Sequence, residues 1–585
     1  MIIPDARLKF FRRVKSVRTS TGDDIDAGKI IRAILHLWQA RKFPELRSAR
    51  VPWGTAAYVA DPAVEEFADW VSRQPFGDAA YWIATTYALL VDRGTRSERA
   101  LFFTPPILAD RLISNLVSAG VELVKNTWHD PACGGSAFLV PLALRMMKGL
   151  EGTKLTAKQK LIAIENAISG NDIDAELLHL SAALLEMATF PLIRESRYTP
   201  TFNLTIGDGL IAAGSATYDA VICNPPYRKL KASEVHAYRE AHGDVIEGQP
   251  NIYGLFINRS LSLAKRDGLI GLLTPTSFLS GNSFSKLRAK LLREASVLSV
   301  DMLGNRKSMF IDVLQETAIT LLRPTEADRD DANAKTQIVV LTDDGKYRDV
   351  GKFPLPNSGS PWPIPRSADD AALVAAAERG QFTLADYGYV ARIGSLVAYR
   401  DKRPRFAKRP VDPKDRLIVP LIWATDIAPN GVFDHGRQHR SRKSRPYVQI
   451  KGFNEAGVVK IRSVLLQRLT SSDQRSRLVA APISPAWLKK NEAYVCENHV
   501  IVLEPTKQAS ISVEHMAALL NTKAVDRIFR TISSATNVAV SELNALLLPA
   551  PKAWIAATEN TTDFEMAARV AYEGTASLAK GRVKP

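Results

Sequence analysis

Cysteine is scarce in this chain, with three among 585 residues. The three are not spaced as a disulfide framework or as a zinc site, which needs closely spaced pairs of Cys or His. We therefore expect a protein of a reducing compartment, the cytoplasm, without a structural metal. Two of them, Cys133 and Cys223, fall in turns that matter below.

Long hydrophobic runs are also missing. No apolar segment approaches the roughly 20 residues that a bilayer-spanning helix needs, and residues 1–21 mix charges with short apolar pieces, unlike a signal peptide. The content of hydrophobic residues, 46%, and of charged residues, 24%, is ordinary for a folded protein. The sequence predicts a soluble protein with no membrane partner.

Acidic residues are too few to balance the basic ones: 61 Asp and Glu face 77 Lys and Arg, a net charge of +16. Lys and Arg gain by displacing counterions from phosphates, so a polyanionic partner is favoured. The excess is concentrated in residues 391–445, with 14 Lys and Arg against five Asp and Glu. Four aromatic residues are interleaved there: Tyr399, Phe406, Trp423 and Phe433. This mixture favours contact with phosphates and bases, and a solvated face around core aromatics is the alternative.

At this length we expect two or three domains. Residues 1–95 carry apolar residues at helical spacing and predict a helical N-terminal region. Residues 96–330 alternate short apolar runs with amphipathic segments, which predicts an α/β fold around a parallel sheet. Residues 331–585, after an acidic linker, predict a mixed α+β domain. The expected strands are 121–128, 167–172, 202–206, 218–223, 268–273, 297–303 and 317–322. The expected helices include 174–187, 251–265, 512–531 and 563–579.

A glycine-rich turn, residues 130–138, closes the first expected strand and opens a helix. Its small residues let the backbone approach a ligand closely, and a helix N-terminus favours polar or anionic groups. An acid follows the second strand, where a carboxylate can accept both hydroxyls of a ribose. Spacing favours Asp172 for this role over Asp174, which can instead cap the next helix.

The sequence Asn224-Pro225-Pro226-Tyr227 ends another expected strand. The Asn224 side-chain oxygen and the Pro225 carbonyl can accept the two hydrogens of an exocyclic amine. Consecutive prolines stiffen the turn and leave their carbonyls without competing N–H donors. Together the two turns predict a nucleotide-type cofactor beside an amide cradle, which indicates methyl transfer to adenine in DNA.

In these motifs the chain resembles the gamma class of amino DNA methyltransferases, the N6-adenine enzymes of restriction-modification systems. The resemblance covers residues 94–323 in the family's order. It implies a Rossmann-like, seven-stranded methyltransferase domain over 96–330 and a DNA target-recognition domain over 331–585. It also implies double-stranded DNA as substrate and leaves room for a cognate restriction endonuclease as a partner.

The resemblance further implies S-adenosylmethionine (SAM) as the cofactor. The segment around Phe103 would close over its methionine part, and Asp208 would receive the amino group of its adenine. The family loop usually ends Gly-(Ser/Thr)-Gly, whereas this chain ends with Ser136, so we expect SAM binding with a slightly altered turn. The implied cofactor residues are Phe103, Thr104, Pro106, Asp130, Ala132, Gly134, Asp172, Asp208 and Asn224. Residues 249–256 would shape the methionine pocket through Asn251 or Phe256, unless Asn251 only caps a helix.

The implied catalytic residues are Asn224, Pro225, Pro226, Tyr227 and Phe310. Hydrogen bonds to the cradle would pull the adenine nitrogen toward tetrahedral geometry and stabilise its developing positive charge. Tyr227 would stack on the flipped base, returning roughly 1–3 kcal/mol of the extrusion cost. Phe310 matches a second aromatic clamp, and the alternative for it is a core position.

Other functions stay open at this point. A methylation subunit that borrows a separate specificity chain shares the helical N-terminal region. Glutamine N5-methyltransferases use the same Asn-Pro-Pro-Tyr cradle for a side-chain amide, although they are usually much shorter. A fused nuclease is disfavoured because the first 100 residues contain no Glu-x-Lys sequence. A scaffold with a dead SAM fold is disfavoured because it would not need the acid, the Asn and the Tyr together.

Overall fold

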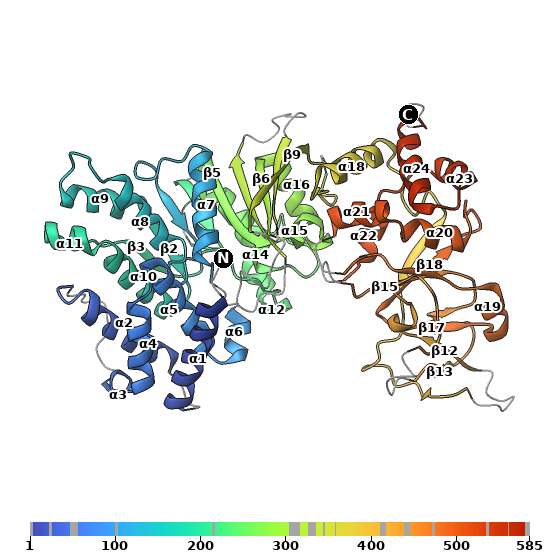
Figure 1. The fold of residues 1–585 in the computed structure, drawn as a ribbon, viewed down its shortest axis with the longest axis horizontal. Coiled ribbons are helices and arrows are strands. Elements are labelled where there is room, and N and C mark those ends of the chain that lie inside the picture. The colour runs from blue at the N-terminus through green and yellow to red at the C-terminus, as the bar shows by residue number, and fades with distance from the viewer. Residues whose placement is uncertain are drawn as a thin grey trace. The chain divides into compact units, whose positions relative to one another are not determined.

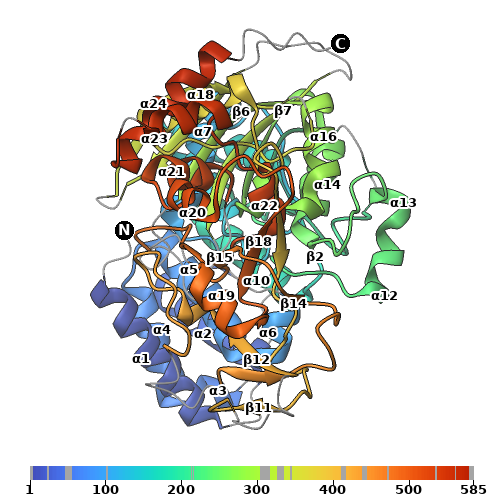
Figure 2. The ribbon, with the colours of Figure 1, turned by 90° about the vertical axis from the view of Figure 1, so that its right-hand side faces the viewer.

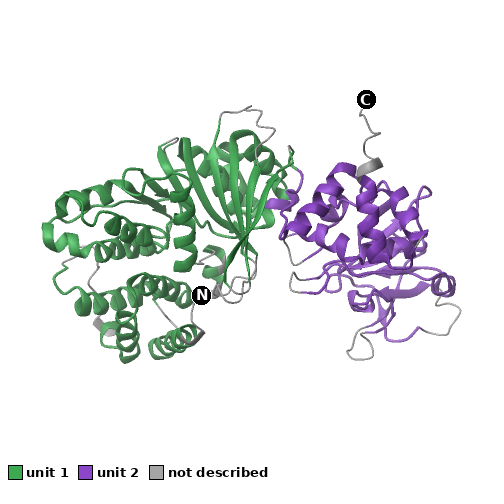
Figure 3. Ribbon diagram, turned by 45° about the horizontal axis from the view of Figure 1, so that its top comes forward, with its two compact units in different colours: residues 1–278, 283–359 green, residues 279–282, 360–585 purple. Residues whose placement is uncertain are grey.

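A computed structural model describes the chain in fifteen stretches, which are residues 4–22, 26–46, 56–99, 103–212, 214, 217–303, 316–325, 335–342, 345–356, 358–409, 417–437, 445–470, 474–533, 537–559 and 561–578. They belong to two compact units (Figure 3). The first combines Met1–Phe278 with Ser283–Gly359, and the second combines Leu279–Asn282 with Ser360–Pro585. The three predicted domains are therefore distributed over two units, and the first unit extends beyond residue 330.

The first unit is built on a nine-stranded sheet of order β3-β2-β1-β4-β5-β7-β6-β8-β9 (Figure 1). The strands are β1 Trp128–Asp130, β2 Ile168–Asp172, β3 Asn203–Ile206, β4 Tyr218–Cys223, β5 Ala264–Pro275, β6 Ala295–Leu303, β7 Thr317–Pro324, β8 Lys335–Leu341 and β9 Tyr347–Pro354. Strands β1 to β5 pair in parallel, and β7 runs antiparallel between β5 and β6. The predicted α/β fold is confirmed, and β8 and β9 extend the sheet beyond the seven expected strands.

The strand predicted over residues 121–128 is wrong, because the strand of the structure begins only at Trp128. Only Trp128 belongs to β1, and the residues before it form turns. The Val121 N–H donates to the Leu116 carbonyl at 3.1 Å, and the Asn126 N–H donates to the Glu122 carbonyl at 3.1 Å. The backbone groups are thus used locally, so the apolar side chains of this segment reach the core without joining the sheet.

Helices cover both faces of this sheet. The helices of this part of the chain are α7 Pro106–Ser118, α8 Leu139–Gly149, α9 Ala157–Ala167, α10 Ala175–Ala188, α11 Phe190–Ser196, α12 Ala232–Val235, α13 Arg239–His242, α14 Ile252–Leu263, α15 Ser277–Ser280 and α16 Ser285–Glu294. Side chains alternate along the strands: Ala220 and Ile222 of β4 join the core shared with α7, α8 and α10. Figure 2 shows the sheet with α7 on one side and α14 and α16 on the other.

The predicted helical N-terminal region is confirmed. Its helices are α1 Pro4–Thr21, α2 Ala27–Lys42, α3 Ala56–Val59, α4 Pro62–Ser72, α5 Phe76–Leu90 and α6 Arg93–Arg99. Aromatic packing holds them together: the Phe10 ring of α1 lies 4.4 Å from the Trp82 ring of α5. Residues of these helices share one hydrophobic core with α7, α8 and α10, so the region packs directly on the sheet's helical layer.

The second unit is the predicted mixed α+β structure. One sheet has β10 Tyr389–Ile393, β18 Val500–Pro505, β15 Val464–Gln467 and β16 Ala480–Pro482, in that order. The other has β11 Arg405–Phe406, β13 Tyr447–Gln449, β12 Ile418–Ile422, β17 Tyr494–Cys496 and β14 Val458–Val459. The helices are α18 Ala368–Gly380, α19 Pro485–Asn491, α20 Val513–Leu520, α21 Lys523–Ile532, α22 Val540–Ala545, α23 Pro551–Glu559 and α24 Phe564–Leu578.

The aromatic residues of the basic segment 391–445 are placed unequally. Tyr399 is 81% exposed, with the Arg400 guanidinium 5.2 Å from its ring centre. Phe433 packs edge-on against Trp487 at 5.0 Å, and Trp423 packs against a hydrophobic cluster of this unit. Among these four aromatic residues, Tyr399 is therefore available to a partner, whereas Phe433 and Trp423 have packing roles.

Within the described part of the chain, no single helix has the length and apolar character to cross a membrane. One bent pair, α10 with α11 at 64°, meets the length and composition criteria jointly.

Candidate cofactor and catalytic site

A cavity of about 300 Å³ lies where β2, β1 and β4 end. Strand β1 pairs with β2 on one side and with β4 on the other, so the strand order reverses at β1. Open α/β sheets bind ligands at such a reversal, beyond the carboxyl ends of the strands. Eight of the nine predicted cofactor residues line the cavity, namely Phe103, Thr104, Asp130, Ala132, Gly134, Asp172, Asp208 and Asn224. The ninth, Pro106, borders a smaller neighbouring cavity.

The predicted catalytic residues are less evenly placed. Asn224 and Pro226 line the cavity, whereas Pro225 and Tyr227 are not among its lining residues. Phe310 lies outside the described residues. Among the described residues no backbone N–H donates to the Pro225 carbonyl.

The glycine-rich turn takes left-handed backbone conformations at two of its residues. Gly134 has φ +50°, and a Cβ there would lie 3.2 Å from the Phe103 ring. Ser136 has φ +60°, which costs a residue with a side chain about 1–2 kcal/mol. The position where the family prefers glycine is thus one that glycine fits better. The Ser136 hydroxyl is buried and has no hydrogen-bond partner among the described residues.

Asp172 holds this turn in place from the end of β2. Its carboxylate accepts the Gly134 N–H at 2.8 Å on one oxygen and the Asp174 N–H at 2.8 Å on the other. Each oxygen keeps a lone pair for a further donor. Burial raises the pKa of Asp172 to about 6, and burial likewise raises the pKa of Asp130 to about 8. The cavity therefore concentrates carboxylates that titrate near neutral pH.

Asp174 caps α10, as its sequence position allowed, by accepting the Glu176 and Leu177 N–H groups at 3.0 and 3.3 Å. Its second oxygen accepts the Tyr87 hydroxyl of α5 at 2.9 Å and the Arg99 guanidinium of α6 at 2.6 Å. The N-terminal helices therefore reach the loop that carries Asp172. Sequence reasoning missed Tyr87 and Arg99 because no spacing links residues so distant in the chain.

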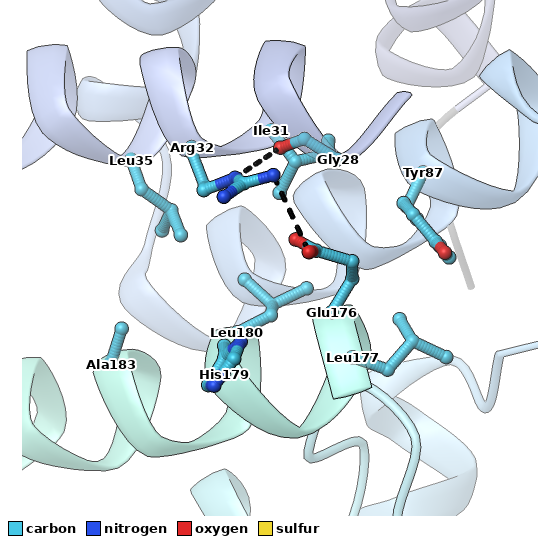
Figure 4. A pocket seen from close by; sticks show the side chains of 10 residues that line it. All are labelled: Gly28, Ile31, Arg32, Leu35, Tyr87, Glu176, Leu177, His179, Leu180 and Ala183. Carbon is cyan, nitrogen blue, oxygen red and sulfur yellow. Dashed lines mark hydrogen bonds and ion pairs between the residues drawn. The ribbon is translucent and has the colours of Figure 1, made fainter. Parts of the chain in front are cut away.

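A second contact joins the same two layers (Figure 4). The Arg32 guanidinium of α2 lies 3.4 Å from the Glu176 carboxylate of α10. Gly28 faces this acid closely, since a Cβ there would come 2.9 Å from a Glu176 oxygen. The first turn of α10 is thus held from α2, α5 and α6 together.

Asp208 also lines the cavity, after β3. It accepts the Leu210 N–H at 3.0 Å and the Tyr238 hydroxyl at 2.7 Å. The turn sits tightly against the first loop, because a Cβ on Gly209 would come 2.0 Å from the Pro131 carbonyl. Tyr238 also lines the cavity and was not predicted.

The segment 249–256 contains both a helix cap and a residue that lines the cavity, the two roles that the sequence left open. Asn251 caps α14, with its side-chain oxygen accepting the Tyr253 N–H at 3.3 Å. Phe256, one turn further, lines the cavity together with Ile252. Phe256 is therefore the residue of this segment that can shape a pocket.

The Asn224 amide is held on both sides. Its nitrogen donates to the Thr104 hydroxyl at 2.9 Å, and its oxygen accepts the Tyr227 hydroxyl. That hydroxyl also reaches the Leu273 carbonyl at 3.0 Å. Burial raises the pKa of Tyr227 well above its ordinary range, so the hydroxyl stays a donor. In this arrangement the Tyr227 hydroxyl is bonded to the Asn224 oxygen, which is the atom predicted to accept a hydrogen bond from an amine.

An ion pair lies beside the cavity. Glu98 of α6, which lines it, pairs with Lys231 at the start of α12 at 2.7 Å. Both side chains are mostly exposed, at 61% and 66%, so this pair is weak and salt-sensitive.

Residues 125–310 match the family described as the Eco57I restriction-modification methylase. This segment is similar to that family over about a third of the chain. It contains the cavity loops from Asp130 to Asn224. Type II methyltransferase M.BsuBI of Bacillus subtilis is 24% identical over 391 residues, which cover 64% of this chain and 74% of that one. Type II methyltransferase M.PstI of Providencia stuartii is 24% identical over 355 residues, or 58% of this chain and 66% of that one.

The fold of the chain has a solved counterpart. MmeI, a type IIL restriction-modification enzyme whose structure was solved in complex with DNA, matches with a TM-score of 0.52 at 10% identity. The match covers 95% of this chain and 88% of that chain. At this identity the likeness concerns the fold alone, and it includes both units.

Proposed function

We propose that this protein is a site-specific DNA methyltransferase that methylates N6 of an adenine flipped out of double-stranded DNA, as the modification enzyme of a restriction-modification system of the bacterial cytoplasm. The observation that carries the proposal is the Asn224 amide, fixed by Thr104 at the wall of a cavity that also presents Asp172 and Asp208. Relatedness to type II methyltransferases supports the same reaction class.

The residues of the cavity fit SAM. Its volume, about 300 Å³, lies at the lower end of the usual range for small-molecule pockets, roughly 300–1,000 Å³. Asp172 offers two acceptor oxygens for a ribose diol, and Asp208 offers one for an exocyclic amine. Phe103, Ile252 and Phe256 supply apolar walls. When bound, SAM would supply an electrophilic methyl group for the adenine nitrogen.

The protein's own contribution is the position and polarisation of the adenine amine. Thr104 fixes the amide so that the Asn224 oxygen faces away from it, and the Pro225 carbonyl provides the second acceptor. Two acceptors hold both N–H bonds and draw charge toward the nitrogen. The amine must displace the Tyr227 hydroxyl from Asn224. The displaced hydroxyl can then donate to the Leu273 carbonyl, which lies 3.0 Å away.

Tyr227 would supply the stacking surface for the flipped adenine. Its ring lies edge-on to Tyr253, with centres 6.1 Å apart at 80°, and its hydroxyl is anchored at the far end. A ring fixed at both ends loses little freedom when a base stacks on it, which is the advantage of preorganisation. The choice of adenine over cytosine rests on Asn224, because cytosine-N4 cradles commonly begin with Ser.

The decisive experiment transfers a labelled SAM methyl group to unmethylated genomic DNA and separates the product nucleosides by mass. We expect N6-methyladenine from the native protein. Asn224→Ala should lower turnover by roughly 10²–10³, the usual cost of one preorganised hydrogen-bonding group, with SAM and duplex binding retained. The exposed residue Asn203 provides a matched control, since Asn203→Ala should leave turnover unchanged.

Two results would contradict the proposal. Near-native turnover in Asn224→Ala would overturn the role of the cradle. Absence of label in DNA, with SAM binding intact, would shift the assignment to a protein glutamine substrate or to a subunit that needs a separate specificity chain. Labelling of a release-factor peptide or of DNA after adding such a chain would distinguish those two.

A further inference from the structure

Helix α1 carries a concentration of positive charge that the proposed reaction does not use. It contains six Lys and Arg residues and a single acid over Pro4–Thr21. Three of these, Arg12, Lys15 and Arg18, are exposed and have no ion pair among the described residues. They follow one another at intervals of three, where like charges repel by about 0.2–0.5 kcal/mol per pair. A helix that keeps this arrangement gains from an anionic partner.

The charges stand on a rigid support. The opposite face of α1 buries Phe10, Val14 and Val17 in the core of the first unit, and Arg13 lies over the Trp70 ring at 5.5 Å. Because the helix is docked, its exposed side chains start from a fixed backbone. Arg12 and Arg18 are six residues apart, about 9 Å along the axis, a span that covers two to three phosphates of one DNA strand at about 3.4 Å of rise each.

An open groove runs beside this face, between α1 and the start of α4. It is lined by Arg12, Lys15, Ser16, Thr19, Ser20, Pro62, Ala63 and Glu66. Its acids are already engaged: Glu66 lies 3.4 Å from Arg13, and Asp61 beside it accepts the Ser20 hydroxyl and caps α4. The remaining Lys, Arg, Ser and Thr groups are the kinds of donor that proteins direct at DNA phosphates.

The location of α1 connects this surface to the cavity. In Figures 1 and 2, α6 lies between α1 and α12. Helix α6 lines the cavity through Glu98 and Arg99, and α12 begins beside Lys231 at its mouth. Helix α1 therefore lies on the same side of the first unit as α6, the helix that lines the cavity.

We propose that the exposed face of α1, formed by Arg12, Lys15 and Arg18, binds the phosphate backbone of the DNA duplex that flanks the methylated base. This proposal rests on the proposed function for the identity of its partner. It assigns the N-terminal helical region a task in DNA binding: the region holds the duplex while one base is extruded. Contacts of this kind carry no sequence information.

The test compares the full chain with the variant Arg12→Gln/Lys15→Gln/Arg18→Gln. Duplex binding is measured by fluorescence anisotropy over a series of salt concentrations. Each lost phosphate contact lowers the slope of log affinity against log salt by about 0.9, so we expect a slope smaller by about 2–3. Affinity at low salt should fall at least about tenfold, while turnover at saturating DNA stays native. SAM binding and the thermal midpoint should be unchanged, because the three side chains are exposed.

A matched control removes the same charge elsewhere. Lys148→Gln/Lys154→Gln/Lys160→Gln acts on the end of α8, on the loop after it and on α9, and none of these lysines lines the cavity. This variant should keep the native slope. An equal slope in all three proteins would overturn the proposal. So would an α1 variant that binds DNA normally but loses binding to vesicles of acidic phospholipid. Failure of the proposed function would appear separately, as absence of methyl transfer by the native protein.

Discussion

The ionisation of the Asp172 carboxylate should affect both the stability of the folded protein and its affinity for SAM. Its pKa is about 6 in the folded protein against an ordinary value of 3.8, because the side chain is buried. The difference of about 2 corresponds to roughly 3 kcal/mol. Since the folded pKa is the higher one, this contribution to stability is complete below pH 3.8 and is lost as the pH rises through 6.

Cofactor binding should reverse this trend. Ribose hydroxyls donate to the ionised carboxylate and favour it, so SAM binding lowers the pKa of Asp172. If the ionised form alone binds, one tenth of the protein is competent at pH 5, and SAM affinity there should be about tenfold weaker than at pH 8. Asp172→Asn should bind SAM more weakly and lose the change near pH 6. The Asn amide also offers only one acceptor oxygen for the Gly134 and Asp174 N–H groups that Asp172 now accepts.

Isothermal titration of SAM from pH 5 to 8 measures this directly. Asp208→Asn is the matched control, since it removes another carboxylate that lines the cavity and should keep the transition near pH 6. Any step caused by Asp130 lies near its own pKa, about 8, and is separable. A flat affinity in the native protein, or an undiminished transition in Asp172→Asn, would refute the assignment of this acid to the ribose.

Two further variants test the turn and the stacking surface. At Ser136, with φ +60°, the glycine variant should be more stable than the alanine variant by roughly 0.5–1 kcal/mol, because only glycine avoids the left-handed strain. This difference in the free energy of unfolding is measured on the denaturation transition that SAM binding shifts. Equal stabilities of the two variants would show that the turn is unstrained. Tyr227→Ala should lower the single-turnover methylation rate by one to two orders of magnitude, the value of a lost base stack, whereas Tyr227→Phe should keep most of it. Equal losses would assign the role to the hydroxyl.

Much of the fold was predictable because its strands are buried on both faces. Strand β4, for example, has four consecutive buried residues at its end, and such runs are recognisable without context. Strand β1 was misplaced because its three residues are fewer than any periodic pattern needs. Strand β9 was missed because it contains no buried residue. Its place in the sheet depends on pairing with β8 and not on its own composition.

The site divides in the same way. Residues in compact motifs, such as Gly134 and Asn224, could be assigned from sequence because each motif carries its geometry within a few positions. Tyr87, Arg99 and Tyr238 could not be, since their relation to the cavity arises from chain segments that meet only in the folded protein. The Tyr227 hydroxyl on Asn224 was also unforeseen, because the motif predicts a stacking ring and says nothing of its hydroxyl when no base is bound.

The triple engagement of Asp174 has a consequence for how this protein can be recombined. A chimaera joined near residue 95 would take Tyr87 from one parent and Arg99 and Asp174 from another, and it would inherit a cofactor loop supported by mismatched partners. A junction near residue 359, where the first unit ends, leaves all three in one parent. Chimaeras that exchange sequence specificity between relatives should therefore stay functional when joined near residue 359 and lose function when joined near residue 95.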